Sequence, residues 1–408
     1  MSFVLTKDQL LFDLYKAFYD AKKHKSNKSY ILKFESNLDE NLSQLCNELW
    51  NRIYQPRPST CFIITHPKKR EVFAADFRDR IVHHLYYNYT YQLFDNTFIE
   101  DSYSCRKEKG THFGIKRLEK HIRQESLNYT RKTFILKMDI MGYFIHINRL
   151  RLLEIVLSEL KKMSTHKISK QTGNLIWSDK LDFKFIYYLS EAIILLDPTK
   201  NCIFRSKKSD WEDLPKSKTL FLTDPNCGLP IGNLTSQLFS NVYLNALDQY
   251  IKRSLKCKHY GRYVDDFYIV SHDKSFLKKI IPLIENFLLY KLLLETNKGK
   301  TQIINYKHGV EFLGAFIKPF RNYISNNTMK RINKQLNDIK TNKMKKKNLE
   351  SSLNSFLGIL GHYKSFNLRK TVFQDYYKFG YFNNSFTKFK SHYSHEKVAF
   401  NRKRAYTY

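Results

Sequence analysis

Two adjacent acidic residues between short apolar runs constrain this chain more than any other feature. Asp265 and Asp266 follow Tyr263 and Val264, and residues Arg262–Val270 have the pattern of a β-hairpin. Adjacent carboxylates repel each other, and a divalent cation would remove that cost. Mg²⁺ prefers oxygen ligands, a few from protein and several from phosphate. The hairpin therefore favours a metal site, although an ordinary Asp-Asp turn remains the alternative.

A third carboxylate lies far upstream. The β-branched and apolar run Thr133–Met138 predicts a strand that ends at Asp139. Only the fold can bring Asp139 to Asp265 and Asp266. Three carboxylates that meet at strand ends would hold two metal ions roughly 4 Å apart, the arrangement for in-line phosphoryl transfer.

A glycine-containing segment lies between these two acidic sites. Residues Gly228–Gln237 open a long predicted helix, Asn233–Leu255. Glycine permits close approach of the backbone to a ligand, and a helix N-terminus favours a phosphate. A plain Gly-Pro turn with a Ser or Thr cap is the alternative.

Charge and composition narrow the class of protein. The 408 residues include 70 Lys and Arg against 38 Asp and Glu, a net charge of +32, which favours nucleic acid as the partner. A lysine-rich, AT-biased coding sequence is the alternative explanation. The cysteines lack zinc-site spacing, and the longest apolar stretch, Phe185–Leu196, is too short to cross a bilayer. No signal-peptide core is visible, so we expect a cytoplasmic protein without a membrane partner.

Together these features resemble reverse transcriptases, over roughly residues 60 to 370. Asp139 with Phe144 resembles the first palm motif of that family, and Tyr263–Asp266 its catalytic hairpin. The other matching segments are Lys69–Arg80 (fingers), Ser102–Thr111 (the next block), Gly228–Gln237 (nucleotide positioning), Asn297–Thr301 (lysine motif) and Val310–Gly314 (primer grip).

The resemblance implies an α+β fold, a right-hand polymerase of fingers, palm and thumb with an antiparallel-sheet palm and a helical thumb. Residues 1–132 would form N-terminal helices and fingers, and residues 133–319 the palm. An irregular insertion at about 200–226, to which we assign no role, would interrupt the palm. Residues 320–382 would form the thumb and residues 383–408 a basic tail. Aromatic residues near that tail (Phe386, Phe389 and Tyr393) are candidates for stacking on single-stranded RNA.

The resemblance also implies roles for individual residues. Asp139, Asp265 and Asp266, with the backbone carbonyl of Ile140, would hold two Mg²⁺ ions, with Mn²⁺ as an alternative; Lys300 would be the general acid. The incoming dNTP would contact Lys69, Arg70, Tyr143, Phe144, Ile231 and Gly232. Template and primer would contact Arg78, Arg80, Arg106, Asn233, Gln237, Tyr263, Phe312, Leu313 and Gly314.

Several of these residues have a simpler interpretation. Lys69 and Arg70 could form a solvated basic turn, Phe144 could be a core aromatic residue, and Lys300 a surface lysine. The three arginines expected at the template, Arg78, Arg80 and Arg106, could instead brace the fingers. Their ion-pair partners would be Asp76, Asp79 and Asp101.

The implied function is RNA-directed DNA synthesis from an RNA template, a DNA or RNA primer and dNTPs. Residues Ile231–Gln237 most resemble bacterial and phage enzymes of diversity-generating retroelements, and this predicts error-prone copying, since Ile231 cannot donate a hydrogen bond. Such an enzyme would need a basic accessory protein or a structured non-coding RNA. The alternatives are an antiphage-defence reverse transcriptase that makes templated or untemplated DNA, and a non-catalytic RNA-binding scaffold.

Overall fold

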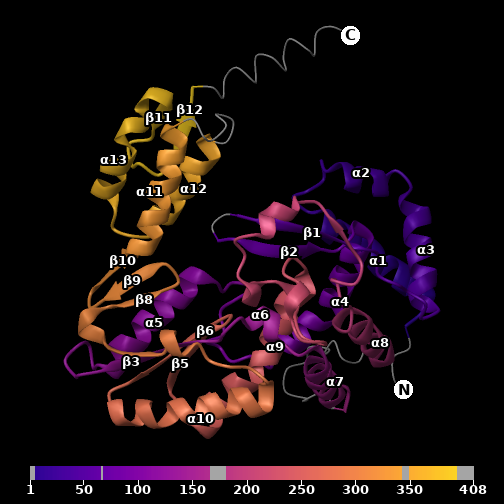
Figure 1. The fold of residues 1–408 in the computed structure, drawn as a ribbon, viewed down its shortest axis with the longest axis horizontal. Coiled ribbons are helices and arrows are strands. Elements are labelled where there is room, and N and C mark those ends of the chain that lie inside the picture. The colour runs from indigo at the N-terminus through magenta and orange to yellow at the C-terminus, as the bar shows by residue number, and fades with distance from the viewer. Residues whose placement is uncertain (1–4, 66–67, 166–180, 342–348, 393–408) are drawn as a thin grey trace, which may run out of the picture. The chain divides into compact units, whose positions relative to one another are not determined.

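The computed structural model describes residues 5–65, 68–165, 181–341 and 349–392 (Figure 1). The chain divides into two compact units. The first comprises Met1–His121 with Phe134–Ile303, and the second Ile122–Thr133 with Ile304–Tyr408. No described helix is both long and apolar enough to span a membrane.

Four helices dominate the N-terminal part of the first unit: α1 (Lys7–Lys22), α2 (Ser29–Glu35), α3 (Leu38–Trp50) and α4 (Phe77–Asp95). Thr6 caps α1 by accepting a hydrogen bond from the Gln9 backbone N–H, as the sequence predicts. Apolar residues at helical spacing, such as Leu10 and Leu14 on α1, are fully buried and pack α1 against α3 and α4.

A small sheet follows, with strand order β2-β1-β4. Strands β1 (Ser59–Ile64) and β2 (Arg70–Ala74) are antiparallel, and β4 (Cys202–Phe204) pairs in parallel with β1. The prediction of irregular structure was wrong at β4. Strand β4 has only three residues, which is too few to show an alternating apolar pattern. It is a strand because it pairs with β1, which lies far upstream in the sequence. Short 3₁₀ turns follow at Lys208–Trp211, Lys216–Lys218 and Leu220–Leu222.

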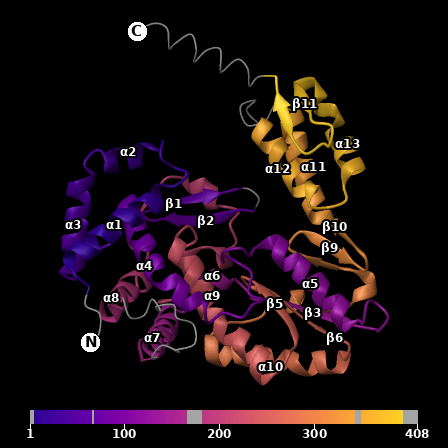
Figure 2. The ribbon, with the colours of Figure 1, turned by 180° about the vertical axis from the view of Figure 1, so that it is seen from behind.

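The central sheet is antiparallel. Strands β5 (His259–Tyr263) and β6 (Asp266–Ser271) form the predicted hairpin, and β6 pairs with β3 (Phe134–Asp139). The predicted α+β fold with an antiparallel palm sheet is confirmed. The first unit also contains α6 (Tyr143–His146), α7 (Arg149–Thr165), α8 (Phe183–Ile194), α9 (Leu234–Gln249), a π-helical turn (Tyr250–Ser254), α10 (Lys274–Leu292) and a 3₁₀ turn (Lys298–Lys300). Helix α10 packs against β6 and α9 (Figures 1 and 2).

Two elements cross the boundary between the units: α5 (Thr111–Glu125) and β7 (Gln302–Asn305). The second unit then contains a 3₁₀ turn (Tyr306–His308) and a sheet of three strands, β8 (Val310–Phe312), β9 (Ala315–Lys318) and β10 (Arg321–Ile324). Three helices follow: α11 (Asn326–Lys340), α12 (Leu349–Gly361) and α13 (Phe366–Phe373). Another 3₁₀ turn (Gln374–Phe379) leads to a hairpin of β11 (Gly380–Phe382) and β12 (Phe389–Ser391).

The hydrophobic core of the second unit includes Leu353, Phe373, Phe386 and Phe389. The expectation that Phe386 and Phe389 stack on RNA was therefore wrong. Phe389 is fully buried and Phe386 nearly so, because the β11–β12 hairpin folds back onto α12 and α13. Tyr393 lies outside the described residues.

Candidate active site

The fold brings Asp139 to the tandem aspartates. Asp139 is the last residue of β3 and Asp266 the first of β6, and the register places them directly opposite each other. Such pairs in an antiparallel sheet have Cβ atoms about 4.5–5.5 Å apart on the same face. Asp265 lies in the tight turn between β5 and β6, next to Asp266. All three carboxylates therefore lie at one end of the central sheet.

The electrostatics of this cluster indicate excess negative charge. Burial, and then repulsion from Asp139, raises the pKa of the Asp265 carboxyl to about 6. Burial also raises the pKa of Asp266, although Lys137 opposes the shift. The Asp266 Oδ1 atom is buried and, within the described chain, has no hydrogen-bond partner. A buried acceptor without a donor is unfavourable, so a cation would stabilise this position.

Two lysines partly neutralise the cluster. Lys300 Nζ lies 2.7 Å from Asp139 Oδ2, and Lys137 Nζ lies 3.4 Å from Asp266 Oδ2. The hydrogen bond to Asp139 raises the pKa of the Lys300 ammonium, which stays protonated. The Lys300 side chain is mostly exposed, so the contact with Asp139 holds it beside the acidic residues, and burial does not.

The donor set suits a hard divalent cation. Within the described ranges, no group of three His, Cys, Asp or Glu side chains is already arranged to hold a metal ion. Lys300 forms an ion pair with Asp139, and Lys137 forms one with Asp266. Carboxylate oxygens are nevertheless the ligands that Mg²⁺ and Mn²⁺ prefer, and Asp266 Oδ1 is unpartnered. Backbone bonds on either side of Ile140 tie this segment to residues 295–297 without using its carbonyl. The residues therefore fit the expected metals.

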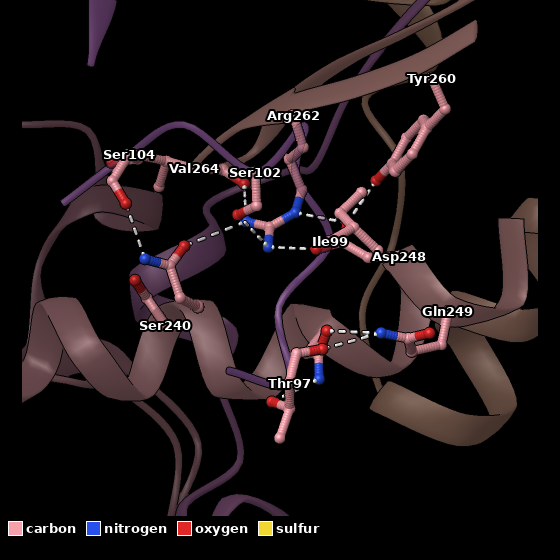
Figure 3. A network of polar contacts seen from close by, with 12 residues as sticks. Thr97, Ile99, Ser102, Ser104, Ser240, Asp248, Gln249, Tyr260, Arg262 and Val264 are labelled. Carbon is pink, nitrogen blue, oxygen red and sulfur yellow. Dashed lines mark hydrogen bonds and ion pairs between the residues drawn. The ribbon is translucent and has the colours of Figure 1, made fainter. Parts of the chain in front are cut away.

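A buried ion pair next to the β5–β6 turn was missed by sequence reasoning (Figure 3). The guanidinium of Arg262 on β5 is fully buried and binds Asp248 of α9 through Nε–Oδ1 and Nη2–Oδ2 contacts of 2.8 and 2.6 Å. Arg262 Nη1 also donates to the Val264 carbonyl at 2.9 Å, directly before Asp265. Val264 has a φ of +56°, which a β-branched residue rarely adopts, so Arg262 holds a strained turn.

The network around this pair extends to neighbouring elements. Tyr260 donates its hydroxyl hydrogen to Asp248 at 2.5 Å, and Arg262 Nη2 donates to Ser102 Oγ at 3.2 Å (Figure 3). The available signal was a lone Asp in α9 and a lone Arg in β5, two segments that otherwise contain no Asp, Glu, Lys or Arg. That signal does not identify which charges pair, because the partners lie on different elements.

The segment before α9 is attached to strand β2. The Ile231 carbonyl accepts from the Phe73 N–H at 3.0 Å, and Asn233 Oδ1 accepts from the Ala75 N–H at 3.2 Å. Gly232 has a φ of +128°, and a Cβ atom there would lie 2.9 Å from Val72 Cγ1. Glycine is thus required at this contact. Asn233 is a structural contact in this arrangement, whereas Gln237 is exposed.

The residues expected at the nucleotide differ in accessibility. Arg70 is exposed at the start of β2, and Lys69 Nζ lies 3.9 Å from Asp213 Oδ2. Phe144 is half-buried, with its ring 5.4 Å from that of Tyr143. Tyr143 itself is buried and donates its hydroxyl hydrogen to the Ser240 carbonyl at 2.5 Å, so its side chain supports α6 against α9.

The three arginines expected at the template mostly brace the protein. The guanidinium of Arg78 is buried and bonded to Glu48, and that of Arg106 binds Asp95 at 2.6 Å and the Ile99 carbonyl at 2.6 Å. Both are used internally, which corrects the expectation of template contacts. Arg80, which is half-buried, donates to the Ala75 carbonyl at 2.8 Å.

The predicted bracing partners were also partly wrong. Asp101 pairs with Arg117 at 2.6 Å and Asp76 with Arg57 at 3.7 Å. Arg78 lies 3.7 Å from Asp79, as expected, and its backbone N–H donates to Asp76 at 3.0 Å. Pairing is decided by which helices lie side by side, and charge order in the sequence does not specify it.

The remaining residues expected to contact template and primer lie in the β5–β6 hairpin and in the β8–β9 hairpin. Tyr263 is half-buried and pairs with Asp266 in the β5–β6 register. Phe312 is buried in the second unit, and Leu313 and Gly314 form the β8–β9 turn with positive φ angles of +50° and +82°.

The sequence of this chain is similar to one known protein family. The sequence model described as "Reverse transcriptase (RNA-dependent DNA polymerase)" matches residues 66–317, which is more than half of the chain. No curated protein sequence matches the chain.

Solved structures similar to the chain include an apo telomerase from Candida tropicalis truncated from its C-terminal domain, with 14% identity, a TM-score of 0.47, and coverage of 70% of this chain and 60% of that one. Another is a telomerase from Candida albicans in complex with a TWJ fragment of telomeric RNA, with 14% identity, a TM-score of 0.46, and coverage of 82% and 58%. The chain thus spans about three fifths of the length of these structures. From the match over residues 66–317, the chain belongs to the reverse transcriptase family.

Proposed function

We propose that this chain is an RNA-directed DNA polymerase that makes cDNA from an RNA template by two-metal nucleotidyl transfer. The observation that carries the proposal is the pairing of Asp139 with Asp266 across β3 and β6, with Asp265 in the adjoining turn and Asp266 Oδ1 unpartnered in the described chain. The net charge of +32 supports a nucleic-acid substrate.

The metal ligands in this proposal are Asp139, Asp265, Asp266 and the Ile140 carbonyl, with Mg²⁺ as the metal and Mn²⁺ as an alternative. Held by these ligands, two bound ions would supply activation of the primer 3′-hydroxyl and neutralisation of the charge on the leaving pyrophosphate. Lys300 is held beside the acidic residues by Asp139, and its protonated ammonium is suited to donate a proton to the pyrophosphate.

Other residues bind and orient the substrates. Lys69 and Arg70 bind the triphosphate, because a guanidinium matches phosphate geometry. The half-buried Phe144 ring excludes a ribose 2′-hydroxyl, and Ile231 and Gly232 contact the nascent base pair. Template and primer contacts are assigned to the accessible members of the expected set: Arg80, Gln237, Tyr263, Leu313 and Gly314.

The test is dNTP incorporation by the purified full chain on poly(A)/oligo(dT). Product is expected with Mg²⁺ or Mn²⁺ and is expected to disappear when EDTA removes the metal, because the carboxylate cluster alone cannot stabilise the transferring phosphoryl group. RNA binding without incorporation in either metal would contradict the proposal and leave an RNA-binding scaffold.

We also propose that the enzyme is of the bacterial or phage diversity-generating retroelement type, on the basis of Ile231–Gln237. It would then depend on an RNA template with a basic accessory protein or a structured non-coding RNA. DNA synthesis that needs no template, together with phage resistance in cells, would favour the antiphage-defence type instead.

This subfamily proposal predicts the effect of Ile231→Gln on fidelity. We expect fewer errors at template adenines, because glutamine can hydrogen-bond at a position where the aliphatic Ile231 cannot. The measurement is sequencing of cDNA made by the two enzymes. Ile231→Leu is the control, since it keeps an aliphatic side chain and should keep the error spectrum. An unchanged spectrum in Ile231→Gln would exclude this explanation of fidelity.

A further inference from the structure

One buried carboxylate joins strand β2 to the insertion, whose strand β4 also pairs with β1. Glu71 on β2 is only 4% exposed. Its Oε1 atom accepts hydrogen bonds from Trp211 Nε1 at 2.7 Å and from Thr219 Oγ1 at 2.8 Å, and its Oε2 atom accepts from the Leu220 N–H at 2.7 Å. All three donors come from the insertion, so both oxygens of Glu71 are satisfied by a segment about 140 residues away in the sequence.

Apolar contacts reinforce this attachment on the same face of the sheet. Glu71 lies opposite Ile63, and Phe73, two residues further along β2, lies opposite Cys61. Residues two apart on a strand share a face. Cys61 and Phe73 pack with Leu220, and Trp211 lies against this cluster. The insertion therefore covers the face of the hairpin that Glu71 occupies.

The hairpin also carries the proposed triphosphate-binding residues. Lys69 and Arg70 directly precede Glu71 in the sequence. The insertion also contributes Asp213, whose carboxylate lies 3.9 Å from Lys69 Nζ but is almost fully exposed. An exposed pair of this kind contributes little. The buried Glu71 contacts are thus the main link between the insertion and this end of β2.

We propose that Glu71 is a positioning residue, and that the insertion Cys202–Leu222 is the buttress that holds Lys69 and Arg70 for the incoming nucleotide. This inference rests on the proposed polymerase function. Without the insertion, which supplies β4, the β1–β2 hairpin would have only two strands. An isolated two-stranded hairpin is marginally stable, so the insertion helps it to hold a fixed geometry. A carboxylate that loses its donors while buried is strongly unfavourable, so removing the donors moves the start of β2.

The main experiment measures steady-state incorporation of dTTP on poly(A)/oligo(dT) by Glu71→Gln. Whichever way the amide is turned, its NH2 group faces either the Leu220 N–H or the Trp211 and Thr219 donors, so at least one of the three hydrogen bonds is lost. We expect the KM for dTTP to rise roughly tenfold, the scale of one charge-assisted hydrogen bond, with kcat within about twofold of the parent. The Kd for primer–template is expected to stay unchanged. Glu154→Gln is the matched control, because it makes the same change at an exposed glutamate on α7, outside the insertion and the β1–β2 hairpin.

Two milder variants keep the test decisive if Glu71→Gln does not fold. Trp211→Phe keeps an aromatic ring but removes the Nε1 donor, and Thr219→Val removes the hydroxyl donor at similar size. Each is expected to raise the KM for dTTP by a smaller factor than Glu71→Gln. The effect of Trp211→Phe should be smaller in the Glu71→Gln background than in the parent, since Trp211 and Glu71 contribute to one shared contact.

The outcomes separate the inference from the function on which it rests. A parent chain that incorporates no dNTP would overturn the proposed function itself. An active parent whose variants show a lower melting temperature and lower kcat at unchanged KM would overturn the inference, because Glu71 would then only stabilise the fold. A selective rise in KM, absent in Glu154→Gln, is the supporting result.

Discussion

Asp265→Asn is expected to reduce dNTP incorporation by at least about a thousandfold, because metal-bound carboxylates supply several kcal/mol of transition-state stabilisation. RNA binding should be retained, since the substitution changes one charge of a strongly basic chain. The fold should also be retained. Burial and the neighbouring Asp139 raise the pKa of Asp265 to about 6, so its ionised form destabilises the metal-free fold near neutral pH. An uncharged isostere removes that penalty.

The measurements are incorporation on poly(A)/oligo(dT), RNA binding by filter retention, and the melting temperature without metal. Asp8→Asn, at an exposed aspartate in the first turn of α1, is the matched control and should leave all three nearly unchanged. An Asp265→Asn variant that still incorporates dNTPs at the parental rate would show that the carboxylate cluster is not the catalytic centre.

Asp248→Asn is expected to lower the free energy of unfolding by about 3–5 kcal/mol, because it leaves the Arg262 guanidinium buried without its counter-charge. Chemical denaturation measures this loss. Glu154→Gln is the control, since Glu154 forms an exposed pair with Arg151 on one helix turn and should change stability by less than about 1 kcal/mol. A loss for Asp248→Asn as small as that of the control would show that the buried pair is not held as described.

The double substitution Asp248→Leu with Arg262→Met separates stability from the role of Arg262 at the β5–β6 turn. Two apolar side chains of similar volume avoid burying charge, so much of the lost free energy of unfolding should return. Activity should not return, because the Val264 carbonyl loses its donor and the strained turn before Asp265 loses its brace. Recovery of both stability and activity would show that Arg262 is not needed to position the turn.

Local sequence patterns determined much of the proposed catalytic centre. The apolar runs on either side of Asp265 and Asp266 predict a hairpin, and the run before Asp139 predicts a strand that ends at that residue. A hairpin and a strand end depend mainly on neighbouring residues, which is why these elements were predictable. The resemblance of several motifs in order then supplied the α+β polymerase fold, since motif order reflects the order of elements in the chain.

Pairings between distant segments were decided only by the tertiary structure. Arg262 with Asp248, Arg106 with Asp95, and Glu71 with its three donors in the insertion all join residues from different elements. Phe386 and Phe389 read as exposed aromatic residues among basic ones, yet a hairpin folds them into a core. The physical reason is the same in each case. Periodicity reports which face of one element is buried, whereas the partner buried against it depends on contacts that the chain makes only when folded.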